Sequence, residues 1–131
     1  MVTDRVGDFI IRLQNAAAVG KREVALPYSA HLAAIARKLK ELGFLESVEA
    51  KEKEGVQKQL IVTLAYENAA PRLRGVKRIS KPGRRLYAPA TKTHRAKGGR
   101  GVRLLTTSAG ILSDAEVRKN RVGGEELFEI W

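Results

Sequence analysis

The stretch TTSAGILSDAEVRKNRVGGEELFEIW, residues 106–131, predicts most of the second half of the fold. Three hydroxyl side chains and a glycine follow the apolar run 102–105, so a strand is expected to end at this turn. Ser113-Asp114-Ala115-Glu116 has the pattern of a capping box, in which the first and last side chains each bond a free backbone amide. A short helix is therefore expected to begin here and to end at Val122-Gly123-Gly124.

The segments around this helix are predicted to form short strands. Glycine and proline interrupt the sequence often enough to keep each strand short, with a tight turn at Lys81-Pro82-Gly83. The last strand is expected to place Phe128 and Ile130 on one face. The expected strands of this half are residues 77–80, 84–87 and 125–131.

The first half of the chain predicts a small α/β structure. Apolar residues at helical spacing indicate one helix capped by Thr3 or Asp4 and a second helix that is capped by Ser29 and ended by Gly43. A hairpin follows, because a charged turn at 51–55 is followed by a segment, 57–66, in which apolar residues alternate with less apolar ones. The apolar face of the first helix is expected to comprise Val6, Phe9, Ile10, Leu13 and Ala17. The expected strands are residues 24–26, 44–50 and 57–66.

These elements place the chain in the α+β class with two small lobes. The N-terminal lobe, residues 1–67, has the element order α-β-α-β-β, and the C-terminal lobe, residues 68–131, is β-rich with a short helix. Glu67-Asn68-Ala69-Ala70-Pro71 is interpreted as the connector. A chain of 131 residues with 44% hydrophobic content is long enough to bury a core of its own.

Positive charge is concentrated in one segment, residues 69–112, which is called the basic tract. The formal net charge is +11, and the basic tract contains twelve Lys and Arg residues but no Asp or Glu. Such local repulsion favours a polyanionic partner, and nucleic acid is the leading candidate. Two alternatives stay open. The first is an adaptor for an anionic membrane surface or an acidic protein, and the second is a basic face that only keeps the chain soluble.

Other classes of function find little support in the sequence. The chain has no cysteine and only two histidines, His31 and His94, so a metal site is not expected. Ser108-Ala109-Gly110 resembles the end of a nucleophile elbow, but Thr106 stands where its first glycine belongs, so no catalytic residue and no enzyme is predicted. No apolar stretch approaches the roughly 20 residues that cross a bilayer, which predicts a cytoplasmic protein with no membrane partner.

The hydroxyl-rich turn at residues 106–110 is the best candidate for binding at close range. Ser and Thr side chains can reach base edges, a 2′-hydroxyl or a phosphate, and Gly110 allows the backbone to approach the ligand. A structural role is equally open, in which the hydroxyls bond their own backbone. Tyr87, the only aromatic residue of the basic tract, would either stack on a base or ribose or face the core.

The sequence resembles the family of bacterial small-subunit ribosomal protein eight from Asp4 to Trp131. The resemblance rests on SKPGRRLY at 80–87, TSAGILSDAEVRKNRVGGE at 107–125, DRVGDFIIRLQNA at 4–16 and GFL at 43–45. A hydroxyl-rich turn, a capped short helix, Gly-Gly-Glu and a terminal strand in this order make the C-terminal motif specific.

The resemblance implies a structural constituent of the small ribosomal subunit in the cytoplasm, with no cofactor and no reaction. Such a protein would bind a helical element of the central domain of small-subunit rRNA, support assembly and contact neighbouring ribosomal proteins. In some members the partner is also an operon mRNA that mimics the rRNA site. With Arg84 added from the basic tract, the expected RNA-binding residues are Asp4, Arg12, Asn15, Lys81, Arg84, Arg85, Tyr87, Thr106, Thr107, Ser108, Gly110, Gly124 and Glu125.

Three departures from the family pattern modify these expectations. The family turn usually reads Ser-Thr-Ser-Lys-Gly, so Ala109 replaces a lysine and one phosphate contact is expected to be missing. A short apolar helix of the family is replaced by the basic, glycine-rich segment 93–101, which is expected to become ordered on RNA. Ala30 and Leu32 stand where lysines are often found, so the second helix is expected to contribute less to RNA binding.

Overall fold

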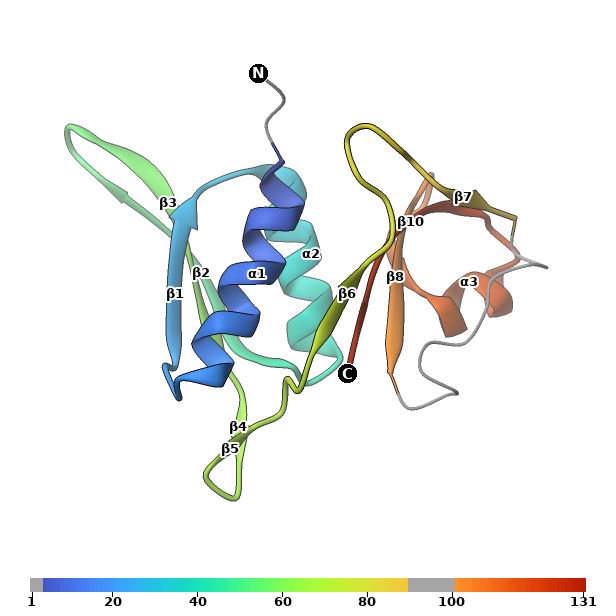
Figure 1. Cartoon of the computed structure of the whole chain (residues 1–131). Coiled ribbons are helices and arrows are strands. Elements are labelled where there is room, and N and C mark those ends of the chain that lie inside the picture. Colours follow the sequence, from blue (N-terminus) through green and yellow to red (C-terminus); the bar gives the residue numbers. More distant parts are fainter. Residues whose placement is uncertain (1–3, 90–100) are drawn as a thin grey trace. The chain divides into compact units, whose positions relative to one another are not determined.

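The computed structural model describes residues 4–89 and 101–131. Its contacts divide the chain into two compact units, which are called the first unit (Asp8–Arg74) and the second unit (Met1–Gly7 with Gly75–Trp131). The domain boundaries expected from the sequence, 1–67 and 68–131, stay a prediction. The elements, labelled in Figure 1, are α1 (Arg5–Ala18), β1 (Glu23–Pro27), α2 (Ala30–Glu41), β2 (Leu45–Lys53), β3 (Val56–Leu64), β4 (Tyr66–Glu67), β5 (Ala70–Pro71), β6 (Val76–Arg78), β7 (Tyr87–Ala88), β8 (Val102–Thr107), β9 (Gly110–Ser113), α3 (Asp114–Asn120) and β10 (Gly124–Ile130).

The order of elements confirms the α+β class and the predicted α-β-α-β-β start. Both long helices begin at the expected type of cap, because Asp4 accepts a hydrogen bond from the Gly7 amide (3.0 Å) and Ser29 accepts one from the Leu32 amide (3.5 Å). Gly43, with a φ of +91°, follows the end of α2 in the left-handed conformation that was expected there. Among the described helices, none is long and apolar enough to cross a membrane.

The buried face of α1 differs slightly from the predicted one. Phe9, Ile10 and Leu13 are buried as expected, but Ala16 is buried in place of Ala17, and Val6 is only half-buried. At 3.6 residues per turn, Ala16 lies three residues after Leu13 on the same side of the helix, so the apolar stripe continues through it.

An antiparallel sheet in the order β1-β3-β2 forms the other layer of the first unit. One face is covered, since Leu60, Val62 and Leu64 of β3 are buried while their neighbours are more accessible. In Figure 1 the helices α1 and α2 lie on one side of this sheet. The turn of the predicted hairpin is shorter than expected, because β2 continues to Lys53 and only Glu54 and Gly55 separate it from β3.

The segment interpreted as a connector contains regular structure. Strands β4 and β5 pair as a small hairpin whose two loop residues, Asn68 and Ala69, have φ values of 53° and 64°. Positive φ at both central positions is the pattern of a tight hairpin turn whose twist matches its strands. Tyr66 therefore belongs to β4, and not to the second strand of the preceding hairpin as predicted from the sequence.

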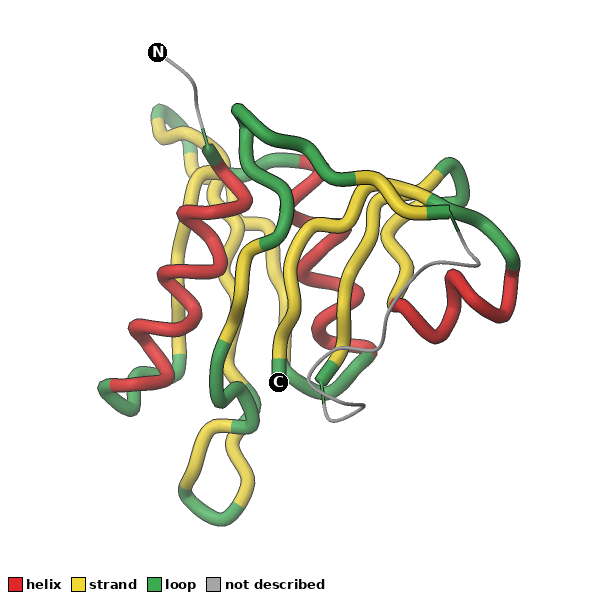
Figure 2. The backbone as a smooth tube through the Cα atoms, turned by 45° about the vertical axis from the view of Figure 1, so that its right-hand side comes forward, coloured by secondary structure: helices red, strands yellow, loops and turns green. Residues whose placement is uncertain are grey.

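The second unit is built around β10. Its sheet has the order β6-β10-β8-β9, and β7 also pairs with β10, so the closing strand has neighbours on both sides (Figure 2). Phe128 and Ile130 are fully buried on one face, as the sequence predicted. The predicted strand 84–87 is wrong in extent, because only Tyr87 and Ala88 pair with β10.

Helix α3 begins at the predicted capping box. The Ser113 hydroxyl accepts from the Glu116 amide (3.3 Å), and the Glu116 carboxylate accepts from the Ser113 amide (3.2 Å). The helix ends earlier than predicted, because Arg121 takes the left-handed conformation (φ 54°) before the glycines are reached. Val117 on its inner side packs against Leu105 and Leu112 in the core.

Candidate nucleic-acid interface

The first residues of β10 bring together segments that are distant in the sequence. Glu125 lies opposite Thr106 of β8 on one side and Tyr87 of β7 on the other, and Gly124 pairs with the next residue on each strand. The hydroxyl-rich turn and β7 therefore lie at the same end of this sheet, with β10 between them (Figure 1). The expected RNA-binding residues of β7, β8, β9 and β10 therefore lie on neighbouring strands at the same end of the sheet.

The hydroxyl-rich turn holds its own shape through Thr107. The Thr107 hydroxyl donates to the Gly110 carbonyl oxygen (2.8 Å) and accepts from the Ala109 amide (3.1 Å). Gly110 has a φ of +109°, a backbone conformation in which a residue with a side chain would be strained. The structural role considered from the sequence therefore applies to Thr107. Ser108 is exposed, and its hydroxyl has no hydrogen bond within the described parts of the chain.

Gly124 is required by the close approach of β10 to β8. A Cβ at this position would overlap the Thr106 carbonyl oxygen and come within 2.9 Å of the Thr107 methyl carbon. The sequence suggested Gly124 as an RNA-binding residue, and the structure gives it an additional reason to be glycine. The backbones of the two strands can approach each other here only without a side chain.

Residues 80–86 form a loop, called the basic loop, that is bonded to β10. The Leu86 carbonyl accepts from the Glu126 amide (2.9 Å), and the buried Ser80 hydroxyl closes the loop by accepting from the Leu86 amide (2.9 Å). Lys81 and Arg84 are joined by reciprocal backbone hydrogen bonds of 2.9 Å, which confirms the predicted tight turn. Both side chains are exposed and form no ion pair with the described residues.

Two further side chains of the edge are placed for contact with a ligand. Tyr87 is 70% exposed, so the alternative in which it faces the core is wrong and its ring is free to stack. Arg85 is exposed beside Glu125, with 3.5 Å between its guanidinium and the carboxylate. The name turn surface is used for the basic loop together with the residues at this end of the sheet. These residues are Arg85, Tyr87, Thr106, Thr107, Ser108, Gly110, Gly124 and Glu125.

The three expected residues from the N-terminal helix are not part of the turn surface. Arg12 and Asn15 belong to the first unit, where Arg12 pairs with Asp8 (3.1 Å) and donates to the Ala25 carbonyl (3.1 Å). Asn15 is exposed. Asp4 belongs to the second unit, and its carboxylate is bound by the Arg78 guanidinium in addition to the Gly7 amide.

The Asp4 carboxylate predicts a dependence of stability on pH. Hydrogen bonding from Arg78 lowers the pKa of Asp4 below its ordinary value of 3.8; burial opposes this shift, and the Gly7 amide adds to it. The stabilisation is therefore present at neutral pH and is lost as the pH falls below 3.8 through the lowered pKa. Asp4→Asn, which keeps a capping side chain, is expected to cost about 1 kcal/mol at pH 7 in urea unfolding. A difference that persists undiminished at pH 2 would contradict this assignment.

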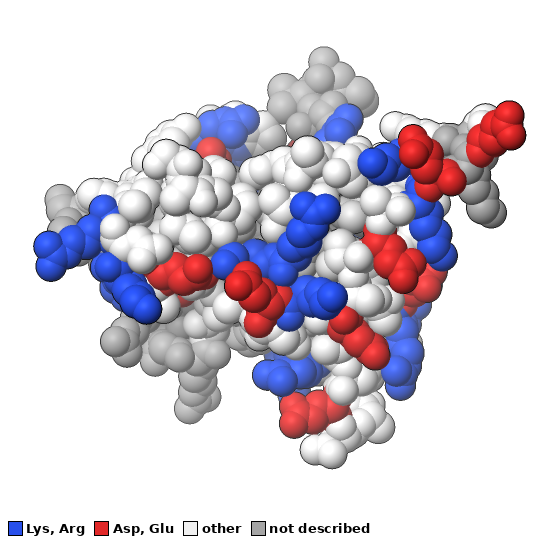
Figure 3. All heavy atoms as spheres, turned by 180° about the vertical axis from the view of Figure 1, so that it is seen from behind, with Lys and Arg blue, Asp and Glu red and all other residues white. Residues whose placement is uncertain are grey.

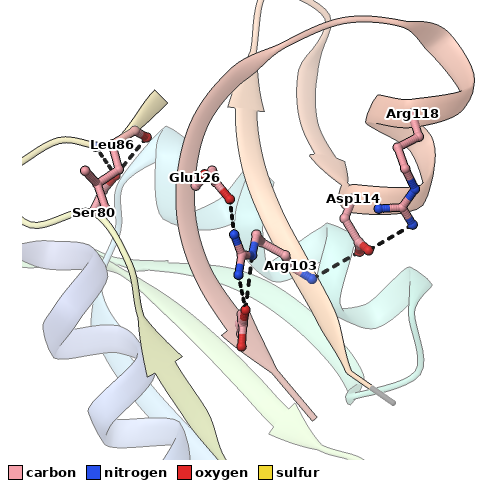
Figure 4. Close-up of polar contacts among 7 residues, drawn as sticks. Ser80, Leu86, Arg103, Asp114, Arg118 and Glu126 are labelled. Atoms are coloured by element: carbon pink, nitrogen blue, oxygen red, sulfur yellow. Dashed lines mark hydrogen bonds and ion pairs between the residues drawn. The ribbon is translucent and has the colours of Figure 1, made fainter. Parts of the chain in front are cut away.

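The basic tract contributes fewer available charges than its sequence suggests. Arg78 is bound to Asp4, and the Arg103 side chain, 15% exposed, lies between Glu126 and Glu129 with contacts to both (Figure 4). Burial by itself lowers the pKa of Arg103, but hydrogen bonds to Glu129 and Glu126 outweigh it and raise the pKa above its ordinary value. The residues Lys92, Arg95, Lys97 and Arg100, like His94, lie outside the described parts of the chain.

The Arg103 cluster, defined as Arg103, Glu126 and Glu129, was not anticipated from the sequence. A β-bulge between Glu126 and Phe128 leaves Leu127 without a partner on β8. Because side chains alternate along a strand, residues three apart normally face opposite sides, and the extra residue places both carboxylates on the side of Arg103. The available signal was the three glutamates, Glu125, Glu126 and Glu129, in a closing strand of seven residues.

Charge is mixed on one face of the molecule (Figure 3). On the face shown in Figure 3, Lys and Arg side chains alternate with Asp and Glu side chains and do not form a field of one sign. His31 is exposed, as expected for a surface residue. Within residues 4–89 and 101–131, no group of His, Asp and Glu side chains is placed to hold a metal ion.

Comparison with known proteins identifies the family. The family model described as ribosomal protein S8 matches residues 4–131. The small ribosomal subunit protein uS8 of Persephonella marina is 40% identical over the full length of both chains, and that of Salinispora arenicola is 42% identical over 99% of this chain and 98% of its own. The uS8 protein of Nitratidesulfovibrio vulgaris is 38% identical over both full lengths. All three relatives are named as a ribosomal protein and none as an enzyme, which agrees with the prediction of no enzymatic activity. The chain belongs to the ribosomal protein S8 family.

Proposed function

We propose that this protein is a structural constituent of the small ribosomal subunit in the cytoplasm and binds a helical element of the central domain of small-subunit rRNA. Within the turn surface, the residues of β7, β8, β9 and β10 make the close contacts, and the basic loop supplies affinity for phosphates. Binding at this site supports subunit assembly beside neighbouring ribosomal proteins. An mRNA that mimics the rRNA helix would be bound by the same surface.

The observation that carries this proposal is the combination of three binding chemistries on the turn surface. The exposed Ser108 hydroxyl offers a donor and an acceptor for base edges or a 2′-hydroxyl, and the exposed Tyr87 ring offers a stacking face. Lys81 and Arg84 of the basic loop are exposed and pair with no acidic side chain of the described residues, so they are available for phosphate contacts. Family membership supports the assignment, since the curated relatives are named as small-subunit proteins.

The decisive experiment is a salt titration of binding to a central-domain rRNA helix and to an unrelated duplex of equal length. The proposal expects a preference of about a thousandfold or more that persists as salt rises, which is the range of specific complexes. Equal binding of both duplexes with a steep loss at higher salt would contradict it. That result would favour the alternative in which the chain is an adaptor for polyanions in general.

Ser108→Ala is expected to weaken binding to the rRNA helix by about 1 kcal/mol, the worth of one hydrogen bond. Ser108 is preferred to Thr107 for this test, because Thr107 holds the turn together and its loss would also change the shape of the turn. The measurement is the dissociation constant at fixed salt, with Ser47→Ala in the first unit as a matched control. Equal affinities of Ser108→Ala and the wild type would remove Ser108 from the interface.

Arg84→Ala is expected to reduce the slope of log affinity against log salt by about one, since one phosphate contact is lost. The preference for the rRNA helix over the unrelated duplex is expected to change little, because phosphate contacts carry no sequence information. Arg37→Ala on α2 is the control, as Arg37 is exposed but lies in the first unit. An unchanged slope for Arg84→Ala would show that this side chain meets no phosphate.

A further inference from the structure

We propose that the Arg103 cluster fixes the register of β10 against β8 and thereby positions the turn surface for RNA. This inference rests on the proposed function, because it concerns the same surface. Arg103, Glu126 and Glu129 are positioning residues in this proposal, since all three are largely buried and act through the strands that carry them.

The observed pairing contains a choice between two registers. On one side of the bulge Phe128 pairs with Leu104, and on the other Glu126 pairs with Leu105, with Leu127 as the extra residue. If regular pairing continued from Phe128, then Leu127 would face Leu105, and Glu125 would face Thr107 in place of Thr106. A shift by one residue also turns every affected side chain to the opposite face of the sheet.

The cluster favours the bulged register over the regular one. With the bulge, Glu126 lies on the same face as Arg103 and contacts its guanidinium. Without the bulge, Glu126 would turn to the face of Phe128 and Ile130, which are fully buried, and its charge would be without a partner in an apolar core. Specifying a register is the best attested use of buried charged groups, which otherwise add little net stability.

The bulge also determines where the parts of the turn surface lie. Gly124 has no Cβ where the Thr106 carbonyl approaches the strand, so the register aligns the glycine with that carbonyl. On the other side of β10, the Glu126 amide donates to the Leu86 carbonyl and the Ser80 amide donates to the Glu126 carbonyl (3.2 Å). Figure 4 shows Ser80 and Leu86 beside the strand that carries Glu126. A shift of this strand would therefore displace the basic loop as well as Glu125.

Further contacts connect the cluster to the start of α3. The Arg103 amide donates to the Asp114 carboxylate (3.1 Å), and Arg118 binds the second oxygen of the same carboxylate (3.1 Å) (Figure 4). The backbone of Arg103 is thus held by α3 while its side chain holds β10. Contacts of Arg103 therefore hold β8 to α3 and β10 to β8.

The test replaces the cluster by apolar residues of similar size, in the triple variant Arg103→Met, Glu126→Leu and Glu129→Leu. Such replacements preserve or raise stability when a buried ion pair is exchanged as a whole. The variant then carries leucine at both 126 and 127, so the regular register no longer turns a charged side chain at 126 toward the core. We expect NMR spectra with a second set of signals for residues 104–110 and 124–127, and cross-strand NOEs between Glu125 and Thr107.

Affinity for the central-domain rRNA helix is expected to fall about tenfold or more in the triple variant, the worth of one or two lost hydrogen bonds. The control is Glu67→Leu with Arg72→Met, which removes an exposed ion pair of the first unit and is expected to keep the wild-type affinity. A triple variant with one set of signals and the wild-type pairing of Gly124 with Thr107 would overturn the proposal. A shifted register with unchanged affinity would also overturn it, because the cluster would then not position the turn surface.

A second variant and a separate measurement on the free protein complete the test. If the triple variant does not fold, Glu126→Gln takes its place. In this variant the amide hydrogens of residues 125–127 are expected to exchange faster than in the wild type. Unchanged exchange rates would overturn the proposal. The register is measured in the free protein. If the wild type itself shows no preference for the rRNA helix, the proposed function fails, while the NMR measurement still decides whether the cluster sets the register.

Discussion

Replacing Arg103 alone by methionine is expected to lower the free energy of unfolding of the second unit by about 3 kcal/mol. Glu126 and Glu129 are 9% and 7% exposed, so removal of the guanidinium leaves two carboxylates in a site with little access to water. Breaking a buried ion pair by removing one partner costs about 3–5 kcal/mol, and we take the lower value because Arg103 remains 15% exposed. The expected loss is large beside the total stability of a small domain.

Urea unfolding followed by the fluorescence of Trp131 measures this effect. Trp131 is the single tryptophan of the chain and belongs to the second unit, so its signal reports on the unit that contains the cluster. Arg85→Met, in the same unit, is the control, because its distance of 3.5 Å from Glu125 and its 58% exposed side chain predict a change within about 0.5 kcal/mol. A loss below about 1 kcal/mol for Arg103→Met would show that water or a rearrangement satisfies the two carboxylates.

The comparison with the triple variant separates charge balance from packing. If the cost of Arg103→Met arises from unpaired carboxylates, removal of the carboxylates as well should restore most of the stability. If the cost arises from the lost packing of the arginine side chain, methionine would replace much of that contact and the single variant would show little loss. The two variants together therefore assign the effect to one cause.

Local sequence patterns predicted those elements that depend on neighbouring residues. The capping box at Ser113 and Glu116 forms as expected, because both hydrogen bonds join residues three positions apart. The same holds for Ser29 at the start of α2 and for Gly43 after its end. In each case the sequence contains both partners of the interaction within one turn of helix.

Features that depend on distant partners could not be predicted from the sequence. The bulge at Leu127 arises from pairing with β8, and the mutual approach of Glu126 and Arg103 depends on it. The hairpin of β4 and β5 escaped prediction because its turn uses Asn68 and Ala69 at positive φ, whereas glycine is the usual signal for such a turn. The left-handed Arg121 hid the end of α3 for the same reason.

The candidate site was predicted in part for a similar reason. The hydroxyl-rich turn was visible as a local pattern, but the neighbours that β10 gives it, Tyr87 and Glu125, follow from strand pairing. Sequence reasoning also left two roles open for the hydroxyls. The structure shows that Thr107 bonds its own backbone, whereas Ser108 is exposed.

Gly124→Ala is expected to destabilise the second unit by about 3 kcal/mol, at the upper end of the usual cost of forcing extra atoms into a packed site. The new methyl group would overlap the Thr106 carbonyl oxygen and lie 3.0 Å from the carbonyl carbon. These are backbone atoms of a strand paired on both sides, so they cannot move aside as the end of a flexible side chain can.

Gly83→Ala provides the matched control for this substitution. Apart from its two chain neighbours, no atom of the described residues lies within 4 Å of a Cβ at Gly83, so the same chemical change is made without a clash. Its effect on stability is expected to be near zero or slightly favourable, because alanine restricts the unfolded chain more than glycine does. Both variants are compared with the wild type by urea unfolding at 25 °C through Trp131 fluorescence. Equal stabilities of the two variants would show that β8 and β10 can separate at Gly124 without cost, and the close approach would then not explain the glycine.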